Sequence, residues 1–317
     1  MSPLSITLFS QAQPSSMSET RRATTPESGD FSSSLSLRLA AFQAQSVNSL
    51  LGSVFNGGQA SSGLDFLTSA SDPLSLLGAS TSSQELSASG LNMSLFDPQS
   101  AYRMMSVINT KDVTYKAQFS ELSEMKTAVA GLQDAGQTLG SVNAAMDNEA
   151  INAQLQTFAG KYNEWIKRFD ATVKSDGVLA GTQAAEVSLY ELEQSVENPF
   201  NGAKDGFHGL RDLGFTIDQN TNLASFDATR LDAALASNRD GTIDTLQQFS
   251  ANFAKSAELL NSPNNFIPNR LANLDRVIDY ISDNKPSLQA EFGLGDPAKP
   301  SAQITKALAA YDQIFKI

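Results

Sequence analysis

Apolar residues recur at helical spacing over most of the chain beyond residue 100. From about residue 104 to residue 146 they follow a seven-residue repeat, the pattern of a coiled-coil seam. The seam consists of Ile108, Tyr115, Leu122, Met125, Val129, Leu132, Leu139 and Met146, and Met104 continues its phase upstream. This pattern predicts one helix of about 45 residues, on the order of 70 Å long. An ordinary bundle helix carries the same stripe, but so great a length favours a coiled coil.

Shorter amphipathic stripes follow this long helix, with turn residues between them. The first, from residue 151 to residue 173, predicts a second long helix antiparallel to the first. Two short β-prone runs, 214–217 and 223–226, flank a polar turn rich in Asn, which predicts a hairpin. Further helices are predicted around residues 182–196, 227–237, 243–260, 271–281 and 304–315.

Residues 1–95 have a different composition, with 25 Ser and no Lys. Such a composition buries too little apolar surface to offset the entropy of ordering, so we expect most of this region to be disordered. One stretch inside it has apolar residues at spacings compatible with one helical face: Leu35, Leu39, Phe42, Leu50, Val54 and Phe55. It is interpreted either as a transient helix in a tail or as a segment that folds against a partner.

The predicted fold is mainly α, with long antiparallel coiled-coil helices and a helical C-terminal half that carries one small β-hairpin. Four segments follow from the pattern. They are a disordered Ser-rich region (1–95), a helical coiled-coil hairpin (96–176), a helical domain with the β-hairpin (177–292), and a linker with a final amphipathic helix (293–317).

Composition and charge narrow the function. The 317 residues carry 22 Lys plus Arg against 34 Asp plus Glu, a formal net charge of −12. No basic cluster is present to bind phosphates, so we expect no nucleic-acid partner. No apolar stretch reaches the roughly 20 residues that span a bilayer, and residues 1–17 lack the pattern of a cleaved signal peptide. We therefore expect neither membrane insertion nor a signal peptide.

Candidate chemistry is sparse. The chain has no Cys and a single His, His208, in a predicted loop. Ser123 with Lys126, and the Ser-Asp-Asn run at Ser282, match two of the three elements of serine β-lactamases, but the third is absent. We regard these matches as coincidence. Acidic pairs such as Glu191 with Glu193 fall on a predicted exposed helical face. The sequence thus predicts no catalytic residue, no cofactor and no metal site, hence a protein that is not an enzyme.

Two blocks of sequence resemble the flagellar hook-associated protein 2 family, which forms the filament cap. The first is the run from Tyr115 to Leu122, and the second joins Leu213–Asp218 to Phe226-Asp227 and Leu231–Leu235. The resemblance covers roughly residues 100 to 292. It implies export through the type III channel without a cleaved signal peptide, and a small homo-oligomeric ring of coiled-coil legs at the filament tip. The family's β-rich outer domains do not fit between Met146 and Ile151, so the chain resembles a shortened member.

The expected function is therefore a non-enzymatic, extracellular assembly protein of the flagellum, whose seam is buried between copies and which helps flagellin to polymerise. The resemblance also implies contact with flagellin or other axial proteins, and an export chaperone that binds near the C-terminal helices. A second interpretation is a cytoplasmic binding module of the flagellar export apparatus, which would use the same helices to bind axial proteins or chaperones.

Overall fold

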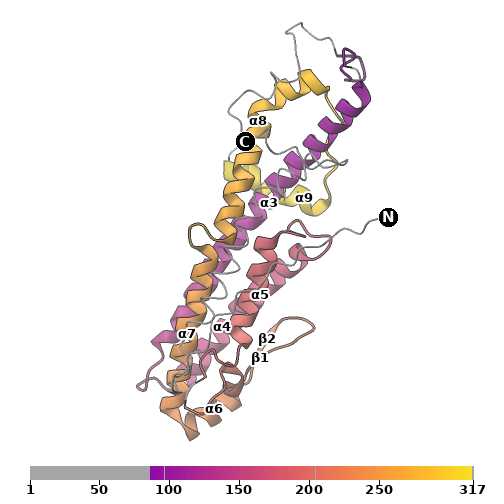
Figure 1. Ribbon diagram of the computed structural model, residues 1–317. Coiled ribbons are helices and arrows are strands. Elements are labelled where there is room, and N and C mark those ends of the chain that lie inside the picture. The colour runs from indigo at the N-terminus through magenta and orange to yellow at the C-terminus, as the bar shows by residue number, and fades with distance from the viewer. Residues whose placement is uncertain (1–85, 96, 204, 316–317) are drawn as a thin grey trace, which may run out of the picture.

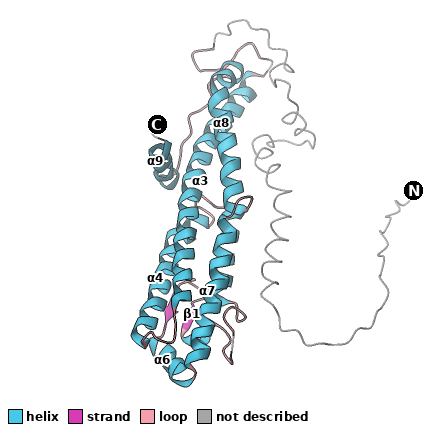
Figure 2. Cartoon of the chain, turned by 90° about the vertical axis from the view of Figure 1, so that its left-hand side faces the viewer, coloured by secondary structure: helices cyan, strands magenta, loops and turns pink. Residues whose placement is uncertain are grey.

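The computed structural model describes residues 86–95, 97–203 and 205–315, which form an elongated, mainly helical rod (Figures 1 and 2). This confirms the predicted mainly α fold. The disorder expected for residues 1–85 and the apolar stripe within them lie outside the described residues. The helices are α3 (Pro98–Thr138), α4 (Asn148–Val173), α5 (Gln183–Glu197), α6 (Ala228–Ser237), α7 (Arg239–Asn261), α8 (Phe266–Phe292) and α9 (Ala302–Phe315).

The longest helix, α3, runs along the rod and packs against α4, α7, α8 and α9. Its start is encoded locally, since the Asp97 carboxylate accepts a hydrogen bond from the Ser100 amide at 3.0 Å. Pro98 occupies the first helical position, where its missing N–H costs nothing.

The end of α3 corrects one expectation. The helix ends at Thr138, and a short 3₁₀ turn, Leu139–Ser141, follows it. Leu139 therefore lies in this turn and Met146 in the connection between α3 and α4, both outside the single helix in which the seam places them. Beyond the 3₁₀ turn the Asn143 side chain accepts a hydrogen bond from the Ala145 amide, a local turn that competes with helix.

The predicted hairpin is confirmed. Strands β1 (Phe215–Ile217) and β2 (Ala224–Phe226) pair antiparallel, with Phe215 opposite Phe226. The turn is closed by the Asp218 carboxylate, which accepts from the amides of Asn220 at 3.0 Å and Thr221 at 2.8 Å. Asp227 then caps α6, as its position before that helix predicts.

One residue of α4 fastens the hairpin to the bundle. The Asn163 side chain accepts from the Ala224 amide at 2.7 Å and donates to the Ala224 carbonyl oxygen at 2.8 Å. A side-chain amide has the same donor and acceptor as a peptide group. Asn163 therefore binds the outer side of β2 as a neighbouring strand would.

The core runs through the segments that the sequence analysis separated. Phe158 of α4 lies with its ring centroid 5.0 Å from that of Phe253 and 5.5 Å from that of Phe249, both on α7. Its ring also lies 5.6 Å from that of Phe215 on β1. The division of the chain at residues 176 and 177 stays a prediction about sequence segments, because side chains from both sides share this core.

The last ten residues of the region expected to be disordered are folded onto the rod. Asn92 is fully buried, and its side chain donates to the carbonyl oxygens of Ala290 at 3.1 Å and Glu291 at 2.8 Å. The backbone of Gly90 accepts from the Leu294 amide at 2.9 Å. This segment is held by hydrogen bonds to residues far along the chain. Neither its composition nor its apolar spacing therefore indicates that it is folded.

The end of α8 completes this contact. Pro286 lies inside the helix, where it removes one backbone hydrogen bond, and the last turns of α8 bend towards the start of α3 in Figure 1. The following loop is tied to α3, because Asn109 donates to the carbonyl oxygens of Leu294 and Asp296, both at 3.0 Å.

Candidate assembly surface

The predicted seam lies inside the bundle of a single chain. Seven of its residues are at most 6 % exposed, and Met146 is partly buried. The helix α3, which carries all of these except Leu139, packs on α4, α7 and α8. The buried seven are Ile108, Tyr115, Leu122, Met125, Val129, Leu132 and Leu139. That the seam also joins separate copies stays a prediction. Within this chain its neighbours are the chain's own helices.

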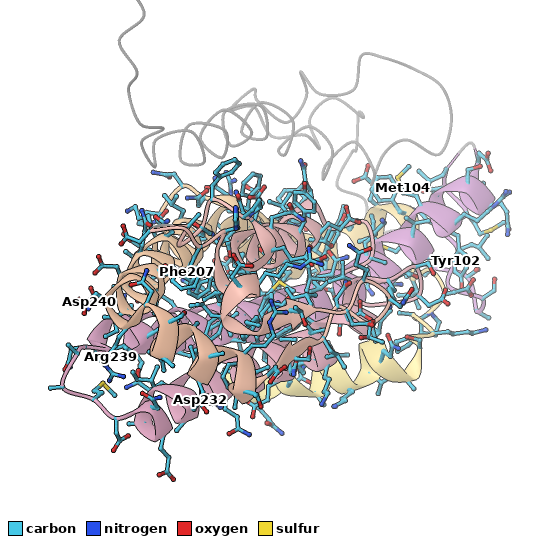
Figure 3. The ribbon with its side chains drawn as sticks, turned by 90° about the horizontal axis from the view of Figure 1, so that it is seen from below. Tyr102, Met104, Phe207, Asp232, Arg239 and Asp240 are labelled. Atoms are coloured by element: carbon cyan, nitrogen blue, oxygen red, sulfur yellow. The ribbon has the colours of Figure 1, made fainter. Side chains whose placement is uncertain are left out.

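The buried side of α3 changes near its start. Met105 is fully buried there, whereas Met104, which the repeat places on the seam, is 39 % exposed and projects from the helix in Figure 3. The loop after α8 lies over Met105, since a Cβ built on Gly295 would lie 2.9 Å from the Met105 Cβ. Near its start α3 is therefore buried by a loop, and a seven-residue repeat does not indicate which residue a loop covers.

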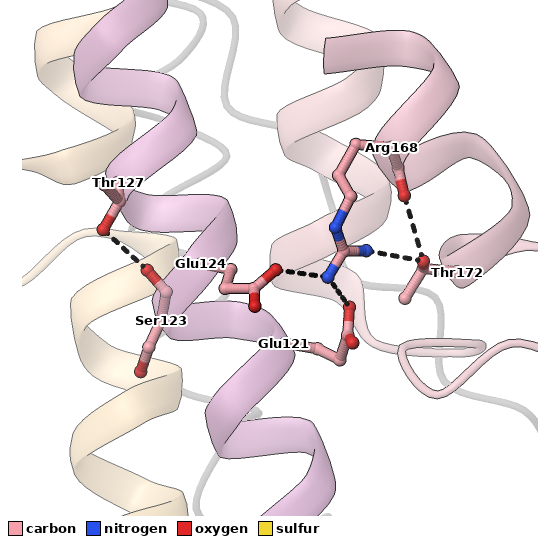
Figure 4. A network of polar contacts seen from close by, with 6 residues as sticks. All are labelled: Glu121, Ser123, Glu124, Thr127, Arg168 and Thr172. Carbon is pink, nitrogen blue, oxygen red and sulfur yellow. Dashed lines mark hydrogen bonds and ion pairs between the residues drawn. The ribbon is translucent and has the colours of Figure 1, made fainter. Parts of the chain in front are cut away.

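A polar network on the rod surface joins α3 to α4 (Figure 4). Arg168 of α4 forms ion pairs with Glu124 and, at 2.9 Å, with Glu121 of α3. Burial alone lowers the pKa of the Arg168 guanidinium, but the two carboxylates outweigh it and raise the pKa overall. The guanidinium therefore remains charged and holds the two helices in register. Because its side chain is 37 % exposed, solvent reduces the strength of these pairs.

Beside this network lies a groove of about 520 Å³ between α3 and α4, with Ile314 of α9 at its edge. Its buried lining residues are Leu132, Trp165 and Phe169. Charged groups line it too, namely the Lys161–Glu164 pair at 2.8 Å and the Arg168 network. The lining residues are Ser123, Glu124, Thr127, Ala128, Gly131, Leu132, Lys161, Glu164, Trp165, Arg168, Phe169 and Ile314.

The C-terminal helix α9 covers part of α3. Its buried side chains are Ala307 and Tyr311, and the Tyr311 ring packs edge-on against Phe119 of α3 at 5.9 Å. The end of α9 is open, with Ile314 53 % and Phe315 41 % exposed. This helix therefore adds apolar surface to the rod while burying little of its own.

Four exposed apolar side chains lie at the end of the rod where α3 begins and α8 ends, and we call them the α3-start patch. They are Met93 (65 % exposed), Met104 (39 %), Val107 (44 %) and Leu294 (46 %). The sequence analysis missed this patch. A signal for it existed, since Met104 and Val107 lie one helical turn apart, but two of the four residues come from loops.

The residues singled out for chemistry lie apart in the fold. The His208 side chain is 82 % exposed, and its Nδ1 lies 3.0 Å from Asp212 Oδ2. Burial raises the pKa of Asp212, but hydrogen bonds from His208 outweigh it and lower the pKa overall. Ser123 lines the groove on α3, while Ser282 lies on α8. Glu191 corrects an expectation, since it is 4 % exposed and faces the bundle interior instead of solvent.

Two features of the described residues bear on partners. They contain no cluster of three or more His, Asp or Glu side chains that could hold a metal ion. Among the helices that the structure describes, none combines the length and the apolar character needed to cross a membrane.

Comparison with known proteins assigns the chain to a family. The family model of the flagellar hook-associated protein 2 C-terminus matches residues 131–292, from the middle of α3 to the end of α8. No curated protein and no solved structure matches the chain. The Tyr115–Leu122 block lies before the matched range, and the hairpin block lies within it. Because the match covers half of the chain and agrees with the resemblance of that block, the protein belongs to the flagellar hook-associated protein 2 family.

Proposed function

We propose that this protein is a non-enzymatic assembly component of the bacterial flagellum. It joins copies of itself through its helical rod and contacts flagellin or other axial proteins at the filament tip, where it helps flagellin to polymerise. Family membership supports the flagellar role. The elongated rod, which places surfaces for neighbouring subunits far apart along one molecule, supports a structural role.

The observation that carries the self-association is the α3-start patch. Met104 and Val107 are exposed on one face of α3, and Met93 and Leu294 are exposed on the two loops at the same end of the rod. At about 25 cal/mol per Å², covering about 50–100 Å² of each side chain would contribute about 1–2.5 kcal/mol. Several such side chains on each copy suffice for association that depends on concentration.

Replacing apolar side chains of the patch with charged ones tests this proposal. We expect the Met104→Lys/Val107→Lys variant to weaken self-association at least tenfold in sedimentation velocity, since losing about 1.4 kcal/mol changes a dissociation constant tenfold. Both residues are exposed, so helix content by circular dichroism should not change. Phe200→Lys is the matched control, because Phe200 is 78 % exposed and lies elsewhere on the rod. Equal association of all three proteins would exclude the patch as the interface.

Location in the cell distinguishes the flagellar role from the alternative. Immunogold labelling of whole cells and fractionation of sheared filaments should place the protein on flagella. Recovery from the cytosol alone would favour the binding module of the export apparatus. We further propose that an export chaperone binds at the C-terminal helices, where the open end of α9 exposes Ile314 and Phe315.

A further inference from the structure

The groove between α3 and α4 is matched by an apolar stripe elsewhere in the chain. We propose that residues 35–55 of the same chain dock in this groove as an amphipathic helix. This inference goes beyond the assembly role and does not depend on it, because it concerns how one chain covers its own surface.

The shape of the groove suits a helix. It lies between two long antiparallel helices, and the large apolar side chains of Leu132, Trp165 and Phe169 form its floor, each at most 3 % exposed. A Cβ built on Gly131, which lines the groove, would meet no atom within 4 Å. An amphipathic helix binds such a groove through side chains spaced three or four residues apart. The charged lining residues already form ion pairs, so an apolar occupant would leave no buried charge without a partner.

The segment offers what the groove requires. Leu35, Leu39, Phe42 and Leu50 lie within about 80° of one another on a helical wheel at 100° per residue, and Ser46 falls among them. Between residues 31 and 55 the charged residues are limited to Arg38. A long apolar stripe with one charge has little reason to remain in water when an apolar groove lies on the same chain.

The connecting chain is long enough. The described residues begin at the end of the rod where α3 starts, and the groove residues of α3 lie about 25–34 residues further on, about 40–50 Å at 1.5 Å per residue. Residues 56–85 supply about 30 residues, with a root-mean-square span of about 30 Å if flexible. Fully extended they reach about 100 Å. A tether of this length keeps the segment at millimolar effective concentration near the groove.

The absence of native cysteine makes a disulfide test clean. In the full chain, Ser46→Cys is combined with Gly131→Cys, which has open space for a side chain. Mild oxidation should then close a disulfide within one chain, seen as a mobility shift on a non-reducing gel and as a cross-linked tryptic peptide. Two control pairs share one cysteine each: Ala44→Cys with Gly131→Cys, on the opposite helical face, and Ser46→Cys with Ala251→Cys, an exposed residue of α7. We expect the test pair to close at least tenfold faster than either control.

Other occupants give other results, and each overturns the proposal. A disulfide between two chains would place the segment of a second copy in the groove. Equal rates for all three pairs would mean that the segment is a loose tail and that the groove serves an outside partner.

A second measurement guards against a disulfide that fails for geometric reasons. With Gly131→Cys alone, docking should slow maleimide labelling of the thiol. Adding Leu39→Asp/Phe42→Asp should speed labelling at least fivefold. The off-face pair Leu37→Asp/Leu51→Asp should leave it unchanged. Identical labelling in the on-face and off-face variants would contradict docking.

Discussion

At the scale of single residues, two glycines five positions apart on α3 have opposite surroundings. A Cβ added to Gly136 would lie 2.5 Å from Cδ1 of Phe253 on α7, whereas one added to Gly131 would meet no atom within 4 Å. Phe253 is fully buried and packs against Phe158, so it has little room to move. Gly136 thus sets how closely α3 approaches α7.

These surroundings predict opposite effects of the same substitution. Gly136→Ala should lower the free energy of unfolding by about 1–3 kcal/mol, because the added methyl group overpacks the contact with Phe253. Gly131→Ala should raise it by up to about 1 kcal/mol, because alanine favours an exposed helix interior. Urea denaturation of both variants measures the difference. Equal stability of the two would mean that α3 and α7 do not pack as closely as the structure shows.

Individual residues also show what sequence reasoning can and cannot reach. The seam residues from Ile108 to Leu139 are buried within one chain, and that they join copies stays a prediction, because a period shows that a stripe is buried and does not show against what. Met104 was misplaced because the loop after α8 covers its neighbour Met105 instead. Asn92 was missed because it holds its segment on the rod through hydrogen bonds to Ala290 and Glu291, almost 200 residues away. No local pattern carries such information.

At the scale of elements, the boundaries follow local signals. The starts of α3 and α6 follow their Asp caps, and the hairpin follows its polar turn. Which helices lie together does not follow from such signals. The sequence analysis paired α3 with α4, whereas α3 also packs along α7, α8 and α9. An amphipathic helix shows that it needs a partner but leaves the partner's identity open.

The helix α9 should be the least stable of the long elements. It buries two side chains against α3, whereas α7 contributes a whole face to the core. Hydrogen exchange should therefore be at least tenfold faster in α9 than in α7, because local opening exposes little apolar surface. Tyr311→Ala should speed exchange in α9 further and leave α7 unchanged, while Ile314→Ala, at an exposed position, should have no effect. Equal protection of α7 and α9 would be the contrary result.

At the scale of the whole molecule, one core joins helices from both halves of the chain. The mainly α class could be predicted because apolar periodicity is a property of each segment. The single core could not, because it depends on contacts such as Phe158 with Phe253, nearly 100 residues apart. The α3-start patch was missed for the same reason, since it gathers residues from three segments.

Net charge sets how salt affects assembly. Each copy carries a formal charge of −12, so copies repel one another at low ionic strength. Because the α3-start patch is apolar, screening this repulsion should strengthen self-association severalfold between 50 and 500 mM NaCl. Sedimentation velocity across this range measures the effect, with Met104→Lys/Val107→Lys as the control that remains monomeric. Weaker association at high salt would point to an interface held by ion pairs.

The two hydrogen bonds between Asn163 and Ala224 have a consequence for solubility. Each strand of a two-stranded sheet has one free edge, where its peptide groups have no partner strand. Such an edge can pair with a strand of another molecule and start aggregation. In this chain the side-chain amide of Asn163 binds both peptide groups of Ala224 on the free edge of β2. At Ala224 a foreign strand would have to displace the Asn163 amide before it could pair, which disfavours aggregation through this part of β2.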